Sequence, residues 1–483
     1  MEVGILNNYL DVRLRTLFTV LTLLGTMCAR IRVNAAPRDA SSASFPAYPV
    51  KVSANGRYLV DQNNIPFLIA GDSPQGLMYR LSEAQAENYF ADRQAHGFNT
   101  AGWIDVACAG RDYPSNIYGA TYDGIRPFTG FIGGGQDWRY YDLRKPNAAY
   151  FARLDHIVEL AAQHGILVFL DPMETAGWLT TLRNNGLAAD YAYGQYLGKR
   201  YEKFPNVAWI NGNDFSSWEN ASNDSVVGAV AKGIKSTDPD ALQTIEFNPP
   251  TGSSLDDPAW RSIVSINGAY VYGPTYIQML YNYNQKPVMP VFLMEAHYDL
   301  EKVGSDYGTP PVLRREEYWT MLSGGKGQFY GNRYTWSFDP GWESNLDTEG
   351  VAQFMIWREF FDSLPWWDLV PDQNHTVVTG GLGNYGTLQA RVSRSDFCTA
   401  AKTSDGSLVI VYMPTARTIS VNMASLKAPA VARWFDPTNG TYATAPGGAF
   451  ANTGTRQFTP PGKNSIGGGD WVLLLKATES TAP

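Results

Sequence analysis

The amino-acid sequence predicts an α/β protein in which a (β/α)8 TIM barrel is followed by a small all-β sandwich. Three observations lead to this prediction. The chain of 483 residues, with 44 % hydrophobic and 17 % charged residues, is long enough for a barrel of roughly 250 residues and a smaller partner. Apolar strand-like segments alternate with helical segments between residues 46 and 372. From about residue 376 short β-type runs replace the helices.

The first half of the barrel begins with an apolar strand at 66–71. Ser82 is a good N-cap for helix 81–96, and Gly97 ends that helix. Strand 98–103 leads into a long excursion before helix 150–164, which Gly165 ends. The pattern then predicts strand 166–170, helix 188–204, strand 207–210 and helix 225–236.

The second half repeats the alternation. It predicts strands 242–247 and 263–272, helix 276–283, strand 288–294, helix 312–322, strand 327–330 and helix 350–361. A doubly wound open sheet is the competing design, but no GxGxxG motif follows the first strand, where that fold usually carries it. The alternation therefore favours a barrel over 46–372.

The segment 376–478 has the pattern of a β-sandwich. Its β-type runs are 408–412, 418–421, 430–435 and 470–475, and turn-forming residues such as those at 436–440 separate them. Residues 363–375 form the expected junction.

The N-terminus predicts export. Arg13 and Arg15 precede an apolar run at 17–29, and Val33-Asn34-Ala35 offers a cleavage site for a signal peptide of residues 1–35. The run is short for a stable membrane anchor. We expect a secreted protein, periplasmic if the source is a Gram-negative bacterium, with no membrane association after cleavage.

Charge and histidine spacing exclude some classes of function. The net charge is −8, and the mature chain has no Lys/Arg block that could neutralise phosphates, so we expect no nucleic-acid partner. The five histidines lack metal-ligand spacing, so we expect no metal and no cofactor. We expect a monomer. Cys108 and Cys398 are expected as two buried thiols, with a disulfide between them as the alternative.

Carboxylates that follow predicted strands indicate the chemistry, because reactive groups of a (β/α)8 barrel lie at the C-terminal ends of its strands. These residues are Asp72, Asp105, Asp171, Glu174, Asp214 and Glu295. Glycosidic cleavage needs one carboxyl group that donates a proton and one carboxylate that attacks or activates water. A single acid at a strand end is commonly a cap or an ion-pair partner. Asp214 after the fourth strand and Glu295 after the seventh are the pair that fits, and the substrate is expected to be an oligosaccharide or polysaccharide.

Several blocks of the chain resemble glycoside hydrolase family 140, the apiosidase-like enzymes with an appended domain named for collagen binding. The blocks are Gly71-Asp72-Ser73-Pro74, Gly97-Phe98-Asn99-Thr100, Asn211-Gly212-Asn213-Asp214, Met294-Glu295-Ala296, Ala432-Arg433-Trp434-Phe435-Asp436-Pro437 and Asp470-Trp471-Val472. The resemblance implies a retaining hydrolase of cell-wall glycan that releases a pentofuranose such as apiose, with Asp214 as acid/base and Glu295 as nucleophile. It does not lead us to expect collagen binding. The chain departs from the family at Ser73-Pro74-Gln75, where a tryptophan is common, and this puts the identity of the sugar in doubt.

Other residues near the predicted strand ends are candidates for substrate binding: Asp72, Trp103, Asp105, Glu174, Asn213, Tyr272, His297, Arg333 and Trp336. The two tryptophans could stack on sugar rings or pack under loops, and the acids could bind hydroxyl groups or form salt bridges. Retention predicts carboxyl groups about 5–5.5 Å apart. We expect Glu295 to be ionised beside His297 or Arg333, and Asp214 to be protonated because Glu295 is near.

Other functions remain open. An endo-acting glycanase of the same barrel clan is one alternative, because loop shape decides between a pocket and a groove. A non-catalytic carbohydrate- or matrix-binding protein is another, although both expected catalytic carboxylates are present. The sandwich could also be purely structural.

Overall fold

The computed structural model describes residues 45–108, 116–216, 221–248 and 252–478. Its first large sheet has eight parallel strands in the order β8-β7-β6-β5-β4-β13-β10-β9. They are β4 (Ile69–Asp72), β5 (Thr100–Asp105), β6 (Leu167–Asp171), β7 (Val207–Phe215), β8 (Gln243–Phe247), β9 (Asn267–Tyr270), β10 (Val291–Glu295) and β13 (Gly327–Tyr330). Backbone hydrogen bonds from Ser265 and Ile266 to the Gln243 carbonyl join the two end strands. The sheet is thus the barrel that the alternation predicts.

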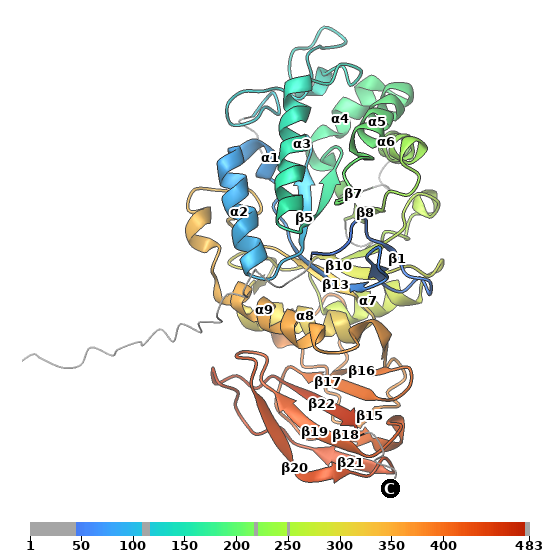
Figure 1. The fold of residues 1–483 in the computed structure, drawn as a ribbon, viewed down its shortest axis with the longest axis vertical. Helices are drawn as coiled ribbons and strands as arrows, with labels where there is room; N and C mark the ends of the chain where they lie inside the picture. The colour runs from blue at the N-terminus through green and yellow to red at the C-terminus, as the bar shows by residue number, and fades with distance from the viewer. Residues whose placement is uncertain (1–44, 109–115, 217–220, 249–251, 479–483) are drawn as a thin grey trace, which may run out of the picture. The chain divides into compact units, whose positions relative to one another are not determined.

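Helices surround this sheet in Figure 1. They are α1 (Leu77–Arg80), α2 (Glu83–Ala95), α3 (Ala148–Gln163), α4 (Thr175–Asn185), α5 (Leu187–Tyr201), α6 (Ala221–Thr237), α7 (Thr275–Asn284), α8 (Pro310–Leu322) and α9 (Glu349–Asp362). Local sequence sets their ends. Ser82 caps α2 in a reciprocal capping box with Gln85, and Gly97 and Gly165 adopt positive φ just after α2 and α3.

Side chains fill the inside of the barrel. Phe329 of β13 lies at its centre in a cluster that includes Phe169 and Phe292. A Cβ atom at Gly71 or Gly102 would lie 2.5 or 2.4 Å from the Phe329 ring. Glycine at these two positions therefore makes room for the ring, and the barrel is a packed core rather than a pore.

Two predicted strands differ from the structure, and one helix was not predicted. The strand at 66–71 is divided into β3 (Pro66–Phe67), which pairs antiparallel with β2 (Leu59–Val60), and β4. Of the strand predicted at 263–272, only the part that forms β9 is a strand. Residues 258–260 form a short 3-10 helix, and a turn follows it before β9 begins. Helix α4 has no counterpart among the predicted elements. It ends at Gly186, whose φ of 77° separates it from α5.

The C-terminal part is all β, as predicted. One antiparallel sheet contains β14 (Leu369–Pro371), β16 (Thr399–Thr403), β17 (Leu408–Met413), β22 (Trp471–Ala477), β19 (Ala430–Phe435) and β20 (Tyr442–Phe450) in this order. The other contains β15 (Val378–Gly380), β18 (Ile419–Asn422) and β21 (Thr455–Phe458). Their inward side chains share one core cluster. In the barrel region, β1 (Lys51–Val52) pairs with β2 in a small sheet with β3, and β11 (Lys302–Val303) and β12 (Asp306–Tyr307) pair with each other.

The structure answers the expectation about the two cysteines but not the one about the signal peptide. Cys398 is a buried free thiol, and Cys108 is buried with its Sγ 3.5 Å from Glu174 Oε2, so no disulfide joins these two cysteines. The predicted signal segment 1–35 lies outside the described residues. Within the residues that are described, no helix is both long and apolar enough to cross a membrane.

Candidate active site

The ends of β7 and β10 carry Asp214 and Glu295. These strands are separated in the closed sheet by β8 and β9. The two intervening strands carry further polar side chains at the same end, Glu246 on β8 and Tyr270 on β9. Four consecutive strands therefore bring acidic and phenolic groups together at the C-terminal face of the barrel.

An irregularity near the end of β7 positions Asp214. The register of β7 against β8 shifts between Asn211 and Phe215, and both Gly212 (φ 75°) and Asp214 (φ 49°) have left-handed backbone conformations. Positive φ is unusual for a residue with a Cβ atom and is found where the surrounding structure enforces it. Asn211 supplies one anchor, since its side-chain amide donates to the Thr244 carbonyl at 2.9 Å.

Tyrosine hydroxyls connect the two carboxylates. Tyr270 Oη lies 3.0 Å from Asp214 Oδ1 and 3.2 Å from Tyr272 Oη, and Tyr272 donates to Glu295 Oε1 at 2.5 Å. This series of three hydrogen bonds spans less than about 9.5 Å, the widest separation at which paired carboxyl groups cleave a glycosidic bond. Both carboxylates can therefore act on one substrate.

Glu295 is surrounded by phenols rather than by cations. Burial and the nearby Asp214 carboxylate raise the pKa of Glu295 to about 8, although hydrogen bonds from Tyr272 and Tyr298 stabilise its ionised form. Tyr298 donates to Glu295 Oε2 at 2.9 Å. The two oxygens of the carboxylate thus each accept a hydrogen bond, which fixes its orientation.

The segment that departs from the family pattern supports Tyr298. Ser73 Oγ and Gln75 Nε2 each lie 3.1 Å from Tyr298 Oη. Because Tyr298 gives its one proton to Glu295, these two side chains can act as donors to the phenol oxygen. Ser73 and Gln75 therefore orient Tyr298, which donates the hydrogen bond to Glu295.

Glu246 is a third carboxyl group of the site. It is 1 % exposed, and its Oε2 accepts a hydrogen bond from the Asp214 backbone N–H at 3.0 Å. Burial, the charges of Glu295 and Asp214, and the more distant Asp171 raise the pKa of Glu246 well above its ordinary value. The surroundings therefore favour the protonated form of Glu246 over its ionised form.

Two of the predicted substrate-binding residues have structural contacts instead. Asp72 is fully buried, and its carboxylate accepts hydrogen bonds from Tyr89 at 2.7 Å and Arg93 at 3.2 Å, both on α2. Trp103 is also fully buried, inside the barrel. Asp72 belongs to an ion pair between strand and helix, and Trp103 offers no exposed face to a sugar, so the proposed binding roles of both are corrected.

Four other candidates lie near strand ends, where the structure shows other contacts for them. Tyr79 donates to Asp105 Oδ2 at 2.7 Å. Glu174 precedes α4 and accepts from Cys108, and the backbone of Asn213 bonds Thr175 Oγ1. Trp336 packs against the main core cluster, with its carbonyl accepting from the Gly76 N–H at 2.7 Å. Their roles toward a substrate stay predictions.

His297 and Arg333 are not the cationic neighbours that Glu295 was expected to have. His297 Nδ1 pairs with Glu316 at 2.6 Å. Burial lowers the pKa of His297, but the Glu316 carboxylate outweighs burial and leaves that pKa raised. The His297 ring packs edge-on against Tyr272, with centroids 5.5 Å apart, and so supports that phenol. Arg333 pairs with Asp339 at 2.7 Å.

Sequence reasoning identified Tyr272 but missed Glu246, Tyr270 and Tyr298. Strand alternation carries a signal for the first of these. On β8, Ile245 and Phe247 belong to the core cluster between the barrel and its helices, so Glu246 must point to the other side, into the barrel mouth. Tyr270 is two residues before Tyr272, so alternation along a strand places the two side chains on the same side. No comparable signal marks Tyr298, which lies in a loop beyond β10.

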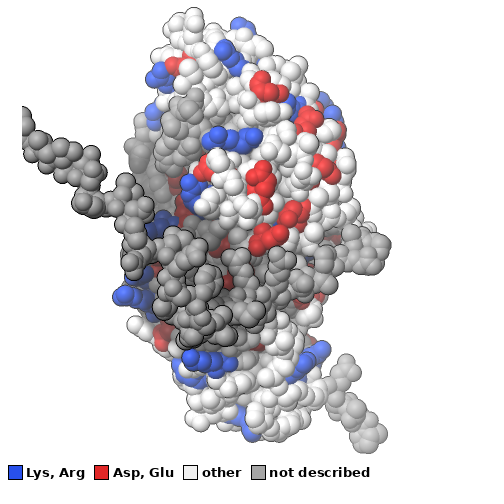
Figure 2. Space-filling model, turned by 90° about the vertical axis from the view of Figure 1, so that its left-hand side faces the viewer, with Lys and Arg blue, Asp and Glu red and all other residues white. Residues whose placement is uncertain are grey.

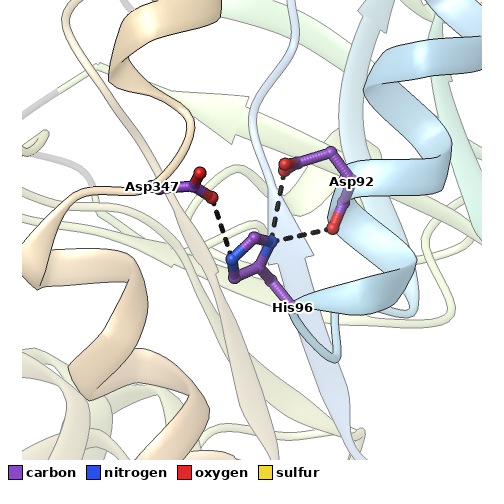
Figure 3. Close-up of side chains that lie close together, drawn as sticks. All are labelled: Asp92, His96 and Asp347. Atoms are coloured by element: carbon purple, nitrogen blue, oxygen red, sulfur yellow. Dashed lines mark hydrogen bonds and ion pairs between the residues drawn. The ribbon is translucent and has the colours of Figure 1, made fainter. Parts of the chain in front are cut away.

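One acidic cluster elsewhere has the spacing of a metal site. Ligand atoms of Asp92, His96 and Asp347 lie within 4.8 Å of one another. Figure 3 shows His96 between the two carboxylates. Its Nε2 is 2.9 Å and its Nδ1 3.3 Å from carboxylate oxygens, and Arg93 also binds Asp92. The hydrogen bond and charge of Asp92 raise the pKa of His96 although burial opposes this. The contacts of His96 and Arg93 with these carboxylates are the arrangement of an ion-pair network.

Basic side chains on the face drawn in Figure 2 are dispersed. Lys and Arg occur singly or in small groups there, with acidic residues between them. This face has the mixed charge of an ordinary protein surface.

Comparison with known proteins adds the family. A family model described as "Apiosidase-like, catalytic domain" matches residues 53–368, and one described as "Putative collagen-binding domain of a collagenase" matches residues 387–476. A solved structure named "Glycoside hydrolase" is 21 % identical, with a TM-score of 0.73, 90 % of this chain covered and 99 % of that chain. A glycoside hydrolase family 5 structure from Bacteroides vulgatus is also 21 % identical, with a TM-score of 0.72, 89 % of this chain covered and 93 % of that chain. At this identity the two structures show the shared fold. A search of curated proteins finds no match.

Proposed function

Because the chain belongs to the apiosidase-like family of glycoside hydrolases, we propose that it cleaves its substrate with retention of configuration, using Asp214 as acid/base and Glu295 as nucleophile. The observation that supports this assignment is the hydrogen-bonded series from Asp214 through Tyr270 and Tyr272 to Glu295. This series supports the pairing of the two carboxyl groups, because it keeps them within the separations at which such pairs cleave a glycosidic bond. The proposal of retention rests on the family resemblance.

In the first step Glu295 attacks the anomeric carbon while Asp214 protonates the oxygen of the leaving group. The covalent glycosyl-enzyme is then hydrolysed by a water molecule that Asp214 deprotonates, which restores both groups. Tyr272 and Tyr298 hold the two Glu295 oxygens in place for attack. The reactive form has Glu295 ionised and Asp214 protonated, so the tyrosine donors favour catalysis by stabilising the negative charge on Glu295.

Alanine variants of the two carboxylates test these roles. Asp214→Ala and Glu295→Ala should each lower kcat on an aryl glycoside by at least about 10³-fold without loss of folding. Asp405→Ala, which removes an exposed acid of the sandwich, is the matched control and should retain full activity. Near-normal turnover by either active-site variant would refute the assignment.

Chemical rescue separates retention from inversion. With Glu295→Ala, azide should restore turnover of an activated glycoside and give the glycosyl azide of inverted configuration, because azide enters from the face that the carboxylate vacated. Isolation of the azide with retained configuration would contradict the nucleophile role.

We propose a cell-wall glycan as the substrate and a pentofuranose such as apiose as the released sugar, as the family description suggests. Pectic, arabinan and arabinogalactan substrates should be screened for released sugars. Free pentose with no change in polymer length supports this proposal, whereas rapid loss of viscosity would indicate the endo-acting alternative.

We further propose that the protein is exported, since the N-terminal pattern is that of a signal peptide. Expression in a secreting host, followed by N-terminal sequencing of the extracellular protein, should give a chain that begins at Ala36. Retention of the intact N-terminus in the cytosol would refute export.

A further inference from the structure

We infer that Glu246 is a positioning residue for the reaction, a buried carboxyl group that holds the backbone of Asp214 in the conformation from which its side chain meets the substrate. This inference rests on the proposed function of Asp214. It concerns a buried residue that does not belong to the predicted catalytic pair.

The backbone of Asp214 needs an external restraint. Its φ of 49° lies in the left-handed region, which is unfavourable for a residue with a Cβ atom unless surrounding contacts enforce it. The register shift between Asn211 and Phe215 removes regular ladder pairing where Asp214 lies. The Asp214 N–H therefore has to find its partner outside the regular sheet.

Glu246 provides that partner from the neighbouring strand. Its Oε2 accepts from the Asp214 N–H at 3.0 Å, and β8 itself is a fully buried strand of the barrel. A side chain on a rigid strand is a more precise support than one on a loop. The hydrogen bond thus fixes the backbone of Asp214, the proposed proton donor, relative to strand β8.

The charge state of Glu246 suits this task. The carboxyl groups whose charges act on it are Asp171 on β6, Asp214 on β7 and Glu295 on β10, and the phenols of Tyr270 on β9 and Tyr298 in the loop after β10 also interact with it. Burial and these charges keep its pKa well above the ordinary value. A neutral Glu246 can accept the hydrogen bond without adding a negative charge to a site where Glu295 has to ionise. Its other oxygen, Oε1, has no hydrogen-bond partner within the described part of the chain, which leaves room for the proton there.

Substitutions that separate shape from charge test the inference. Glu246→Gln retains a neutral acceptor of the same size, so it should keep at least about a tenth of the wild-type kcat. Glu246→Ala removes the acceptor, and a displacement of about 1 Å in the acid/base should lower kcat by the order of 10²-fold, with KM changed less than threefold as an approximate limit. Should Glu246→Ala fail to fold, Glu246→Asp, which is one methylene shorter, provides the same contrast with Gln.

The pH profile distinguishes positioning from an electrostatic role. If Glu246 stays protonated, Glu246→Gln leaves the acid limb of kcat/KM where it is in the wild type. A downward shift of about one pH unit or more would mean that an ionised Glu246 acts on Glu295, and this would overturn the inference. Equal losses in Glu246→Gln and Glu246→Ala, or wild-type kcat in Glu246→Ala, would also overturn it.

Two controls complete the experiment. Glu317→Gln removes another buried carboxyl group, one on α8, and should leave kcat unchanged. Asp214→Ala is measured on the same substrate. If Asp214→Ala is active, the proposed function fails; if it is inactive while Glu246→Ala is fully active, the inference about Glu246 alone fails.

Discussion

Removal of Asp470 should destabilise the protein far more than removal of an exposed acid. Arg314 on α8 is almost completely buried, with 1 % of its side chain exposed, and it donates two hydrogen bonds to Asp470, of 2.7 and 3.1 Å. Asp470 directly precedes β22 of the sandwich. The pair therefore joins the last barrel helices to the C-terminal sheets and belongs to a block on which the family resemblance rests.

The cost can be worked from the contacts. Breaking a buried ion pair on one side costs about 3–5 kcal/mol, because an uncompensated charge stays buried. In Asp470→Ala, Arg314 keeps one acceptor, Gln353 Oε1, so we expect about 3 kcal/mol, the lower end of that range. The exposed Lys427–Asp405 pair is about half exposed on both sides, and Asp405→Ala should cost less than about 1 kcal/mol.

Calorimetry and urea unfolding measure the difference. Asp470→Ala should lower the free energy of unfolding by about 3 kcal/mol. Arg314→Met combined with Asp470→Ala should be more stable than Asp470→Ala alone, because the unpaired charge is gone. If Asp470→Ala stays within about 1 kcal/mol of the wild type, the reasoning from burial is refuted.

Three further outcomes are expected. Tyr298→Phe removes a donor to the nucleophile, so the pKa of the latter rises further and the acid limb of kcat/KM moves up by about one pH unit; an unmoved limb would contradict this. A Cβ atom at Gly273 would lie 1.8 Å from the Leu388 carbonyl oxygen. Gly273→Ala should therefore shift the backbone next to Tyr272 and lower kcat/KM at least about tenfold. Gly228→Ala on α6 is the control and should have no effect on kinetics. Burial raises the pKa of Glu317 to about 8, so the folded state holds a proton that the unfolded state releases, and stability falls as pH rises from about 4.5 to 8. Glu317→Gln should therefore stabilise the protein at pH 8, by no more than about 5 kcal/mol, and not at pH 4, as thermal melts at the two pH values would show.

The barrel could be predicted because each strand is a short apolar run that a longer amphipathic segment follows. The same pattern located Asp214 and Glu295, since a carboxylate that ends an apolar run lies at the C-terminal face of a barrel. The sandwich was predictable as a β region from its turns, but the pairing of its strands was not. Pairing such as that of β17 with β22 joins segments far apart in the chain, and nothing local to either segment specifies it.

Strand alternation explains one of the errors at the site. In β4, Ile69 lies in the interior cluster of the barrel while Leu68 and Ala70 face the surrounding helices. Asp72 is two residues after Ala70, so its side chain points to the same side, toward the helices. Its contacts with Tyr89 and Arg93 of α2 follow from this direction. Counting residues by two from the first strand would have assigned Asp72 to the ion pair with the helix.

The same count fails for Glu295, and the failure has a physical cause. In β10, Phe292 and Met294 point into the barrel, whereas Val291 and Leu293 point outward, so strict alternation places Glu295 outward. The register of β10 against β9 shifts between Leu293 and Glu295, and such an irregularity redirects the side chains that follow it. Glu295 consequently reaches Tyr272 and Tyr298 at the barrel mouth. A register shift is decided by the fit of one strand on its neighbour, so the sequence of β10 alone contains no sign of it. The proposed catalytic residues thus both lie at strand irregularities, and at each of them a neighbouring strand or loop, rather than the local sequence, determines where the carboxylate points.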